Sequence, residues 1–135
     1  MQTGFEQVTV LTLWRKGQPD LLPDGMEFWY RGHKFRHRPN GYTDGMSSPQ
    51  FTHAFSCAEP RGWAFMPAVA HDGAYHGDVE TFGVNPYGQQ GWFPFSFTKD
   101  EADVMFKELL DAIATNDEER AQAIVFYEAV HLSGH

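Results

Sequence analysis

The pattern of apolar and polar positions predicts that the first forty residues are mainly β-structure. Residues 5–15 are a run rich in β-branched and aromatic side chains, which is typical of a strand. Residues 17–25 contain two prolines and two glycines and are expected to form a loop. Residues 27–30 and 33–37 flank an Arg-Gly pair, and this spacing predicts two strands joined by a tight turn.

A short buried helix is predicted over residues 66–76. Pro67 suits a first helical position and Gly77 suits a helix end. Small apolar side chains surround most of this segment, so we expect the helix to be buried on most sides. The segment is of interest because it carries His71 and Asp72.

Two amphipathic helices are predicted in the last third of the chain. The first begins at Thr98 or Asp100, either of which can cap a helix, and the second runs from about residue 117 to residue 132. The apolar stripe of the first helix is Ala102, Met105, Phe106, Leu109, Leu110 and Ile113, and that of the second is Ala121, Ile124, Val125, Ala129 and Leu132.

Together these elements predict an α+β fold, in which an N-terminal antiparallel hairpin is followed by three helices. We expect residues 1–135 to form a single domain. Within it, residues 1–42 are β-rich, residues 43–50 form a polar loop, and residues 51–135 are helical. The helical part is interrupted at residues 77–97 by a segment rich in Gly, Pro and aromatic residues, which we interpret as an aromatic loop that serves as core, lid or interface.

Composition and charge restrict the function. The formal net charge of -8 disfavours general binding to nucleic acids or anionic lipids. A local exception is the basic run at residues 31–38, which we interpret as the solvated rim of a hairpin. Cys57 is the only cysteine, no apolar run is long enough to span a membrane, and no secretion signal is apparent, so a cytoplasmic location is expected.

The candidate chemistry lies in ionisable residues on apparently buried elements. On a helix, His71, Asp72 and Tyr75 can line one wall of a pocket, and Asp103 lies at the edge of the apolar stripe of its own helix. A buried Asp72 needs a partner, which is either a divalent cation shared with Asp44 or donors in the polar loop.

These residues support two interpretations. His71 held by Asp103 would be a general base of fixed tautomer, with Tyr75 beside it. Alternatively, the same residues form a hydrogen-bonded network that performs no chemistry.

The order of short motifs resembles a family of small bacteriophage and prophage proteins that is catalogued as a domain of unknown function. The resemblance spans roughly residues 26–134 and implies a phage-encoded protein in the host cytoplasm or the virion. It is carried by Thr43, Asp44, Ser47 and Pro49, then His71, Asp72 and Tyr75, then Ala102 and Asp103, and finally Tyr127 and Val130.

The arrangement is also similar, more remotely, to phospholipase A2-like enzymes. That similarity implies that His71 activates water, that Asp72 binds calcium, and that Asp103 orients the histidine. This chain lacks the disulfides and the glycine-rich calcium loop of those enzymes, so Asp44 would have to supply the further metal ligand. A metal phosphohydrolase pattern that also uses His53 is less favoured, because that class is almost wholly helical.

Two functions follow. The first is a metal-assisted hydrolase that acts on an ester, with a lipid as one candidate substrate. The second is a non-catalytic virion component or accessory protein that binds a phage or host partner, with the His/Asp cluster as a structural feature.

Overall fold

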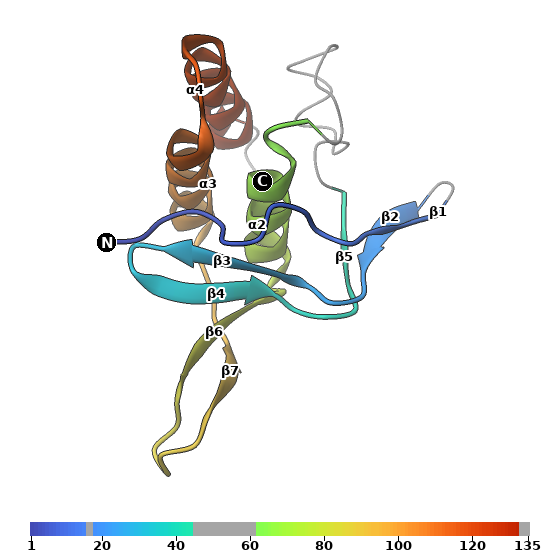
Figure 1. The fold of residues 1–135 in the computed structure, drawn as a ribbon, viewed down its shortest axis with the longest axis vertical. Coiled ribbons are helices and arrows are strands. Elements are labelled where there is room, and N and C mark those ends of the chain that lie inside the picture. The colour runs from blue at the N-terminus through green and yellow to red at the C-terminus, as the bar shows by residue number, and fades with distance from the viewer. Residues whose placement is uncertain (16–17, 45–61, 133–135) are drawn as a thin grey trace.

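Two antiparallel sheets organise the β-rich part of the computed structural model, which describes residues 1–15, 18–44 and 62–132 (Figure 1). The smaller sheet has the order β1-β2-β5 and consists of β1 (Leu13–Arg15), β2 (Gln18–Leu22) and β5 (Gly41–Thr43). The larger sheet has the order β3-β4-β6-β7 and consists of β3 (Met26–Tyr30), β4 (His33–His37), β6 (Val79–Val84) and β7 (Gln90–Pro94).

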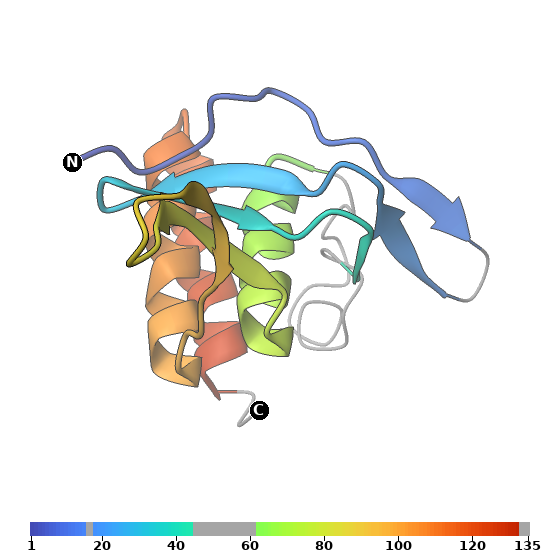
Figure 2. The same ribbon diagram turned by 90° about the horizontal axis from the view of Figure 1, so that it is seen from below.

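Three helices pack beside the sheets. They are α2 (Phe65–His76), α3 (Lys99–Ile113) and α4 (Asp117–Leu132). Helix α2 contacts strands of both sheets and packs on α3, which in turn packs on α4, and Figure 2 shows the three helices side by side beneath the larger sheet. The predicted α+β fold, with an N-terminal hairpin and three helices, is therefore confirmed. None of the helices in the described part of the chain is long and apolar enough to cross a membrane.

The core has two parts, and α2 and α3 contribute to both. Between the sheet and α2 the aromatic rings of Phe28 and Phe35 stack, with centroids 5.7 Å apart, next to Val69 of α2. Between the helices, Phe106 of α3 packs in a second cluster with Phe126 of α4. Because α2 is buried on both sides, its polar residues His71 and Asp72 are held in fixed surroundings.

The predicted turn and helix ends are formed as expected. Arg31 and Gly32 both have positive φ, 49° and 79°, as the central residues of a type I′ hairpin turn require. Helix α2 ends at Gly77, which has φ 75°. Thr98 is the N-cap of α3 and forms a capping box with Glu101, so Thr98 and not Asp100 caps this helix.

Three parts of the sequence-based assignment were wrong. Most of residues 5–15 is not in a strand, since only β1 pairs there and the isolated bridge of Gly4 lies just before this range. The expected loop at residues 17–25 contains β2, whose pairing with β5 outweighs its proline. The aromatic loop at residues 77–97 is largely the β6–β7 hairpin, because its aromatic and β-branched residues pair in register across a turn at residues 85–88.

The buried face of α4 also differs from the prediction. Ile124, Val125 and Leu132 of the expected stripe are exposed, whereas Ala123, Phe126 and Val130 are buried. The second set also recurs at helical spacing, and contact with Trp63 and with α3 selects it. The sequence of α4 therefore holds two apolar stripes, and the neighbouring side chains decide which one is buried.

Candidate functional site

His71 of α2 and Asp103 of α3 form a buried pair. The Nε2 of His71 lies 2.8 Å from Oδ1 of Asp103, and the two residues are only 2% and 1% exposed. Both positions follow from helix packing, because each residue lies on the face where α2 meets α3. The pairing predicted between these residues is present in the structure.

The second oxygen of Asp103 is held by Lys99, a residue that sequence reasoning missed. Lys99 Nζ donates to Asp103 Oδ2 at 2.8 Å and also reaches the backbone carbonyls of Val130 and His131, at 3.3 Å each. The cation thus lies at the C-terminal end of α4, where helix carbonyls lack partners within the helix. The spacing of four residues between Lys99 and Asp103 could have predicted this ion pair on one face of the helix.

The charge of Asp103 is stabilised in spite of its burial. Burial acts to raise the pKa of this carboxyl, but the hydrogen bonds from His71 and from Lys99 outweigh burial and hold the pKa below its usual range. Asp103 is therefore an ionised acceptor at neutral pH. An ionised acceptor favours the tautomer of His71 that carries its proton on Nε2.

The His71 ring is held between two aromatic residues. Tyr75, one turn further along α2, stacks on it with centroids 5.9 Å apart and planes inclined by 17°. Phe106 of α3 contacts the ring at a centroid distance of 5.0 Å. These contacts and Asp103 fix the orientation of the imidazole, and no described residue forms a hydrogen bond with its Nδ1. The one-turn spacing brings Tyr75 beside the histidine, but the single wall predicted for His71, Asp72 and Tyr75 is not formed, because Asp72 faces Thr43 and Asp44.

Asp72 points to a different neighbourhood from His71, at the end of β5. Its Oδ2 accepts a hydrogen bond from the backbone N–H of Asp44 at 3.3 Å, and its side chain is also hydrogen-bonded to Thr43. Nδ1 of His76, one turn along the helix, lies 3.3 Å from Oδ1 of Asp72. Residues 43 and 44 of the polar loop thus supply donors to Asp72, which was one of the two kinds of partner predicted for it, while residues 45–50 lie outside the described residues.

Burial is the main influence on the pKa of Asp72. It raises the pKa of this carboxyl, and the nearby charge of Asp44 adds to the rise, while His76 and the hydrogen bonds from Thr43 and Asp44 oppose it. Asp72 is therefore an under-stabilised carboxylate next to a second carboxylate. Oxygen ligands of this kind suit a hard divalent cation, although the structure does not test the predicted metal ligands Asp44 and Asp72.

A buried histidine of β4 lies beneath the Asp72 region. His37 is fully buried, and its Nε2 has no hydrogen-bond partner among the described residues. The ring fits between two glycines, because a Cβ added to Gly73 or Gly41 would lie 2.5 Å or 2.4 Å from it. His37 therefore sets the separation between β5 and α2, and hence the place of Thr43 relative to Asp72.

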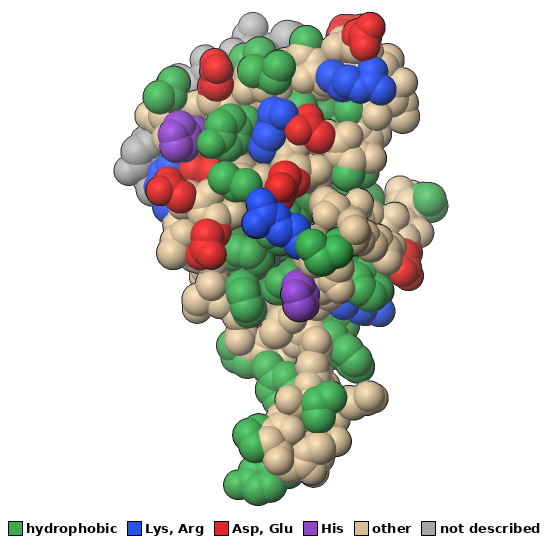
Figure 3. All heavy atoms as spheres, turned by 90° about the vertical axis from the view of Figure 1, so that its left-hand side faces the viewer, with side chains coloured by type: hydrophobic (Ala, Val, Ile, Leu, Met, Phe, Trp, Pro, Cys, Tyr) green, Lys and Arg blue, Asp and Glu red, His purple; other side chains and the backbone are tan. Residues whose placement is uncertain are grey.

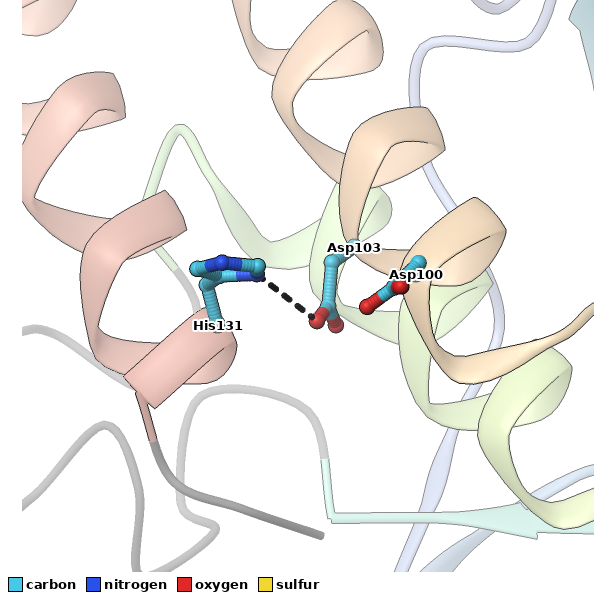
Figure 4. A group of neighbouring side chains, drawn as sticks. All are labelled: Asp100, Asp103 and His131. Carbon is cyan, nitrogen blue, oxygen red and sulfur yellow. Dashed lines mark ion pairs between the residues drawn. The ribbon is translucent and has the colours of Figure 1, made fainter.

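A second group of potential metal ligands includes Asp103. Asp100, Asp103 and His131 each place one ligand atom within 4.8 Å of the others (Figure 4). Sequence reasoning did not find this group, because His131 lies on another helix and only the spacing of Asp100 and Asp103 was visible. Lys99 occupies Oδ2 of Asp103, and His131 Nδ1 is 3.8 Å from the same oxygen, so a cation here would have to displace the lysine.

The basic run at residues 31–38 is not a free cationic patch. Each of its lysine and arginine side chains has a carboxylate partner: Arg31 with Glu108, Lys34 with Glu27, Arg36 with Glu80 and Arg38 with Asp78. Figure 3 shows acidic and basic side chains next to each other on the body of the protein, above the projecting β6–β7 hairpin. These pairs favour the interpretation of the run as a solvated rim and give no support to a nucleic-acid interface.

Comparisons with known proteins do not identify the chain. No family model, no curated protein and no solved structure matches it. The resemblance to a phage family and the remote similarity to phospholipase A2-like enzymes therefore stay predictions, as does the role of His53, which lies outside the described residues.

Proposed function

We propose that the chain is an ester hydrolase in which His71 activates water. The observation that carries this proposal is the 2.8 Å contact between His71 Nε2 and Asp103 Oδ1, made by two residues that are almost completely buried. An ionised carboxylate that accepts from Nε2 leaves the lone pair of the imidazole on Nδ1. A histidine oriented in this way is a general base.

In the proposed reaction, Nδ1 of His71 takes a proton from water as the water oxygen bonds to the ester carbonyl carbon. The positive charge that forms on the ring is stabilised by Asp103. The tetrahedral intermediate then collapses and the bond to the leaving alkoxide breaks. The alkoxide takes up the proton that Nδ1 received from water. Tyr75 and Phe106 keep the ring in place through both proton transfers.

We further propose that Asp72 and Asp44 hold a divalent cation, with calcium as the first candidate. The two residues are close enough for the Asp44 charge to raise the pKa of Asp72, and a bound cation would remove this repulsion. When bound, the cation would polarise the ester carbonyl. A lipid ester is the first substrate class to test, and a phage origin is part of the same proposal.

The test is hydrolysis of short-chain nitrophenyl esters and of phospholipid vesicles by the purified protein, with calcium or with a chelator. His71→Gln should reduce kcat about 100-fold or more, because general-base catalysis contributes about 10²–10⁴-fold. His33→Gln, at an exposed position of β4, is the matched control and should leave the rate unchanged. An unchanged rate in folded His71→Gln, or no turnover of any ester, would refute the proposal.

The metal is tested separately by thermal denaturation in calcium or magnesium. Wild-type protein should melt at a higher temperature with the cation, because a ligand that binds the native state stabilises it. Asp72→Asn should lose this shift. Asp100→Asn should keep it, which separates the proposed site from the group around His131.

A second candidate function is binding without chemistry, in which the His71–Asp103 pair is structural. The observation in its favour is that both oxygens of Asp103 already have donors within the protein, as in a satisfied buried network. The protein would then work as a virion component or accessory factor that binds a phage or host partner. In that case His71→Gln should lower the melting temperature and change no catalytic rate.

A further inference from the structure

The two edges of the larger sheet differ in how their backbone amides are satisfied. The β3 edge is closed by the N-terminal segment. Three successive outward-facing positions along this edge form hydrogen bonds with it: Trp29 with the backbone of Gly4, Glu27 N with Gln7 Oε1, and Arg31 N with Thr3 Oγ1. A sheet edge closed in this way cannot pair with another strand.

The opposite edge, β7, is open. Asn85 N donates to Gln89 O, and Phe95 N donates to Val79 O, so the odd-numbered residues of β7 face β6. The even-numbered residues Gln90, Trp92 and Pro94 therefore direct their backbone groups away from β6. No described residue accepts a hydrogen bond from the N–H of Gln90 or Trp92, and Pro94 has no N–H to satisfy.

Beyond Glu80, the hairpin that carries this edge has no charged side chain. Residues 81–98 contain no Asp, Glu, Lys, Arg or His, in a chain with a net charge of -8. Phe82, Val84 and Phe95 are 44%, 60% and 40% exposed. Figure 1 shows the hairpin projecting from the body of the protein, and Figure 3 shows hydrophobic side chains along it down to its tip. An uncharged, apolar and open edge is a surface for strand pairing.

We propose that β7 pairs with β7 of a second copy of this chain, in antiparallel orientation about a two-fold axis at Trp92. In this register each Trp92 N–H donates to the Trp92 carbonyl of the other copy. Each Gln90 N–H donates to the Pro94 carbonyl opposite. The two four-stranded sheets then become one continuous sheet across the axis.

The sequence of β7 favours this register over the two others that are centred on an outward-facing residue, Gln90 or Pro94. A register centred on Gln90 would place Trp92 opposite Gly88, which belongs to the turn and has φ 80°. A register centred on Pro94 would place two prolines opposite each other, where neither supplies a donor. Among registers centred on an outward-facing residue, only the one with Trp92 at the axis places the missing donor of Pro94 opposite a residue whose own N–H needs an acceptor.

A second copy suits this edge because of the charge distribution. Two molecules of net charge -8 repel each other, and screening limits this repulsion to roughly 8 Å at physiological ionic strength. The projecting, uncharged part of the hairpin lets two copies meet while their charged bodies stay apart. Dimer formation should therefore strengthen as salt is added.

The test is the oligomeric state of the full chain over a concentration series, measured by analytical ultracentrifugation. Wild-type protein should form a dimer. Trp92→Lys and Trp92→Glu should each be monomeric, since like charges would face each other at the axis. An equimolar mixture of the two variants should restore the dimer, because opposite charges then meet. Tyr87→Lys and Tyr87→Glu are the matched controls, at an 88% exposed residue of the turn, and should remain dimeric.

Circular dichroism must confirm that the variants are folded, because Trp92 also packs on Phe82 and Arg36. Gln90→Pro is the independent variant, since it removes an outward N–H without adding charge, and it should weaken the dimer. A monomeric wild type at all concentrations would overturn the proposal. So would a mixture of the two Trp92 variants that stays monomeric, and in that case any dimer uses another surface or register.

Discussion

Lys99 and Asp103 form an ion pair within the first turns of α3, with Nζ 2.8 Å from Oδ2. The other oxygen of Asp103 accepts a hydrogen bond from His71 of α2, and Lys99 also donates to backbone carbonyls at the end of α4. This pair therefore links all three described helices. A change at either residue should therefore affect the packing of the helices as well as the orientation of His71.

Removing the Lys99 cation should destabilise the protein measurably. We expect Lys99→Met to lower the free energy of unfolding by about 1–3 kcal/mol, because a buried carboxylate loses one of its charged donors. The measurement is urea denaturation at neutral pH. Lys107→Met is a matched control, since Lys107 pairs with Asp111 four residues further along the same helix but at the surface. The control should change stability by less than about 0.5 kcal/mol, and equal losses in both variants would contradict the assigned role of Lys99.

The contribution of Asp103 to the free energy of unfolding should disappear in acid. Its pKa in the folded protein lies below the value in the unfolded chain, so the ionised carboxyl stabilises the fold at pH values above the ordinary carboxyl pKa. This stability is lost as the pH falls through the folded pKa. Asp103→Asn should cost about 3 kcal/mol at neutral pH, since it removes one member of a buried pair.

The difference between Asp103→Asn and wild type should therefore shrink as the pH is lowered. Urea denaturation at a series of pH values measures it. Asp111→Asn, on the same helix but in an exposed pair, should show only a small difference at any pH. A difference that stays constant into the acid range would mean that the Asp103 charge does not stabilise the fold.

The contribution of Asp72 to stability should depend on pH with the opposite sign. Its folded pKa is raised, so the protonated form suits the folded protein, and the benefit is lost as the pH rises through the folded pKa. Asp72→Asn should therefore increase stability at neutral pH in the absence of metal, by an amount on the order of 1 kcal/mol, the usual size of a single substitution. The gain should vanish below the ordinary carboxyl pKa. A variant that is less stable than wild type at neutral pH would show that the Asp72 charge is already well compensated.

The local part of the fold could be predicted from the sequence. Helical spacing of apolar residues identified α3, and the residues flanking Arg31 and Gly32 identified the β3–β4 hairpin, because these elements are specified by neighbours in the chain. The β6–β7 hairpin was missed although Asn85 and Gly88 are typical turn residues. Its content of Gly and Pro predicted a loop, whereas Phe82 pairs with Trp92 and Thr81 with Phe93 across two strands.

The candidate site was predicted in part, for a similar reason. Motif order brought His71 and Asp103 together, and the structure pairs them. In the sequence, Lys99 was visible only as a residue four positions before Asp103. The backbone carbonyls that also accept hydrogen bonds from its amine belong to α4. Contacts between residues far apart in the sequence depend on how helices pack, and single-sequence patterns do not specify this packing. The fit of His37 between Gly41 and Gly73 is another contact of this kind.

The contact between His37 and Gly73 predicts that the effect of Gly73→Ala on stability reverses its sign when His37 is replaced. In the wild type, a Cβ at position 73 would lie 2.5 Å from His37 Cδ2, so Gly73→Ala should destabilise the protein by about 1–3 kcal/mol through overpacking. This cost opposes the helix propensity of alanine, which is about 1 kcal/mol better than that of glycine. In a His37→Ala background the obstacle is gone, and the same Gly73→Ala change should stabilise the protein.

A double-mutant cycle of His37→Ala and Gly73→Ala, measured by urea denaturation, tests this reversal. Gly83→Ala in β6 is the control, because nothing lies within 4 Å of the Cβ it would add, and its effect should be the same with or without His37. Equal effects of Gly73→Ala in both backgrounds would mean that α2 can move away from β4 at little cost. The separation between β5 and α2 would then not be fixed by His37, and the position of Asp72 next to Thr43 would need another explanation. Reversal of the sign would show that this imidazole is the spacer that keeps the two segments apart.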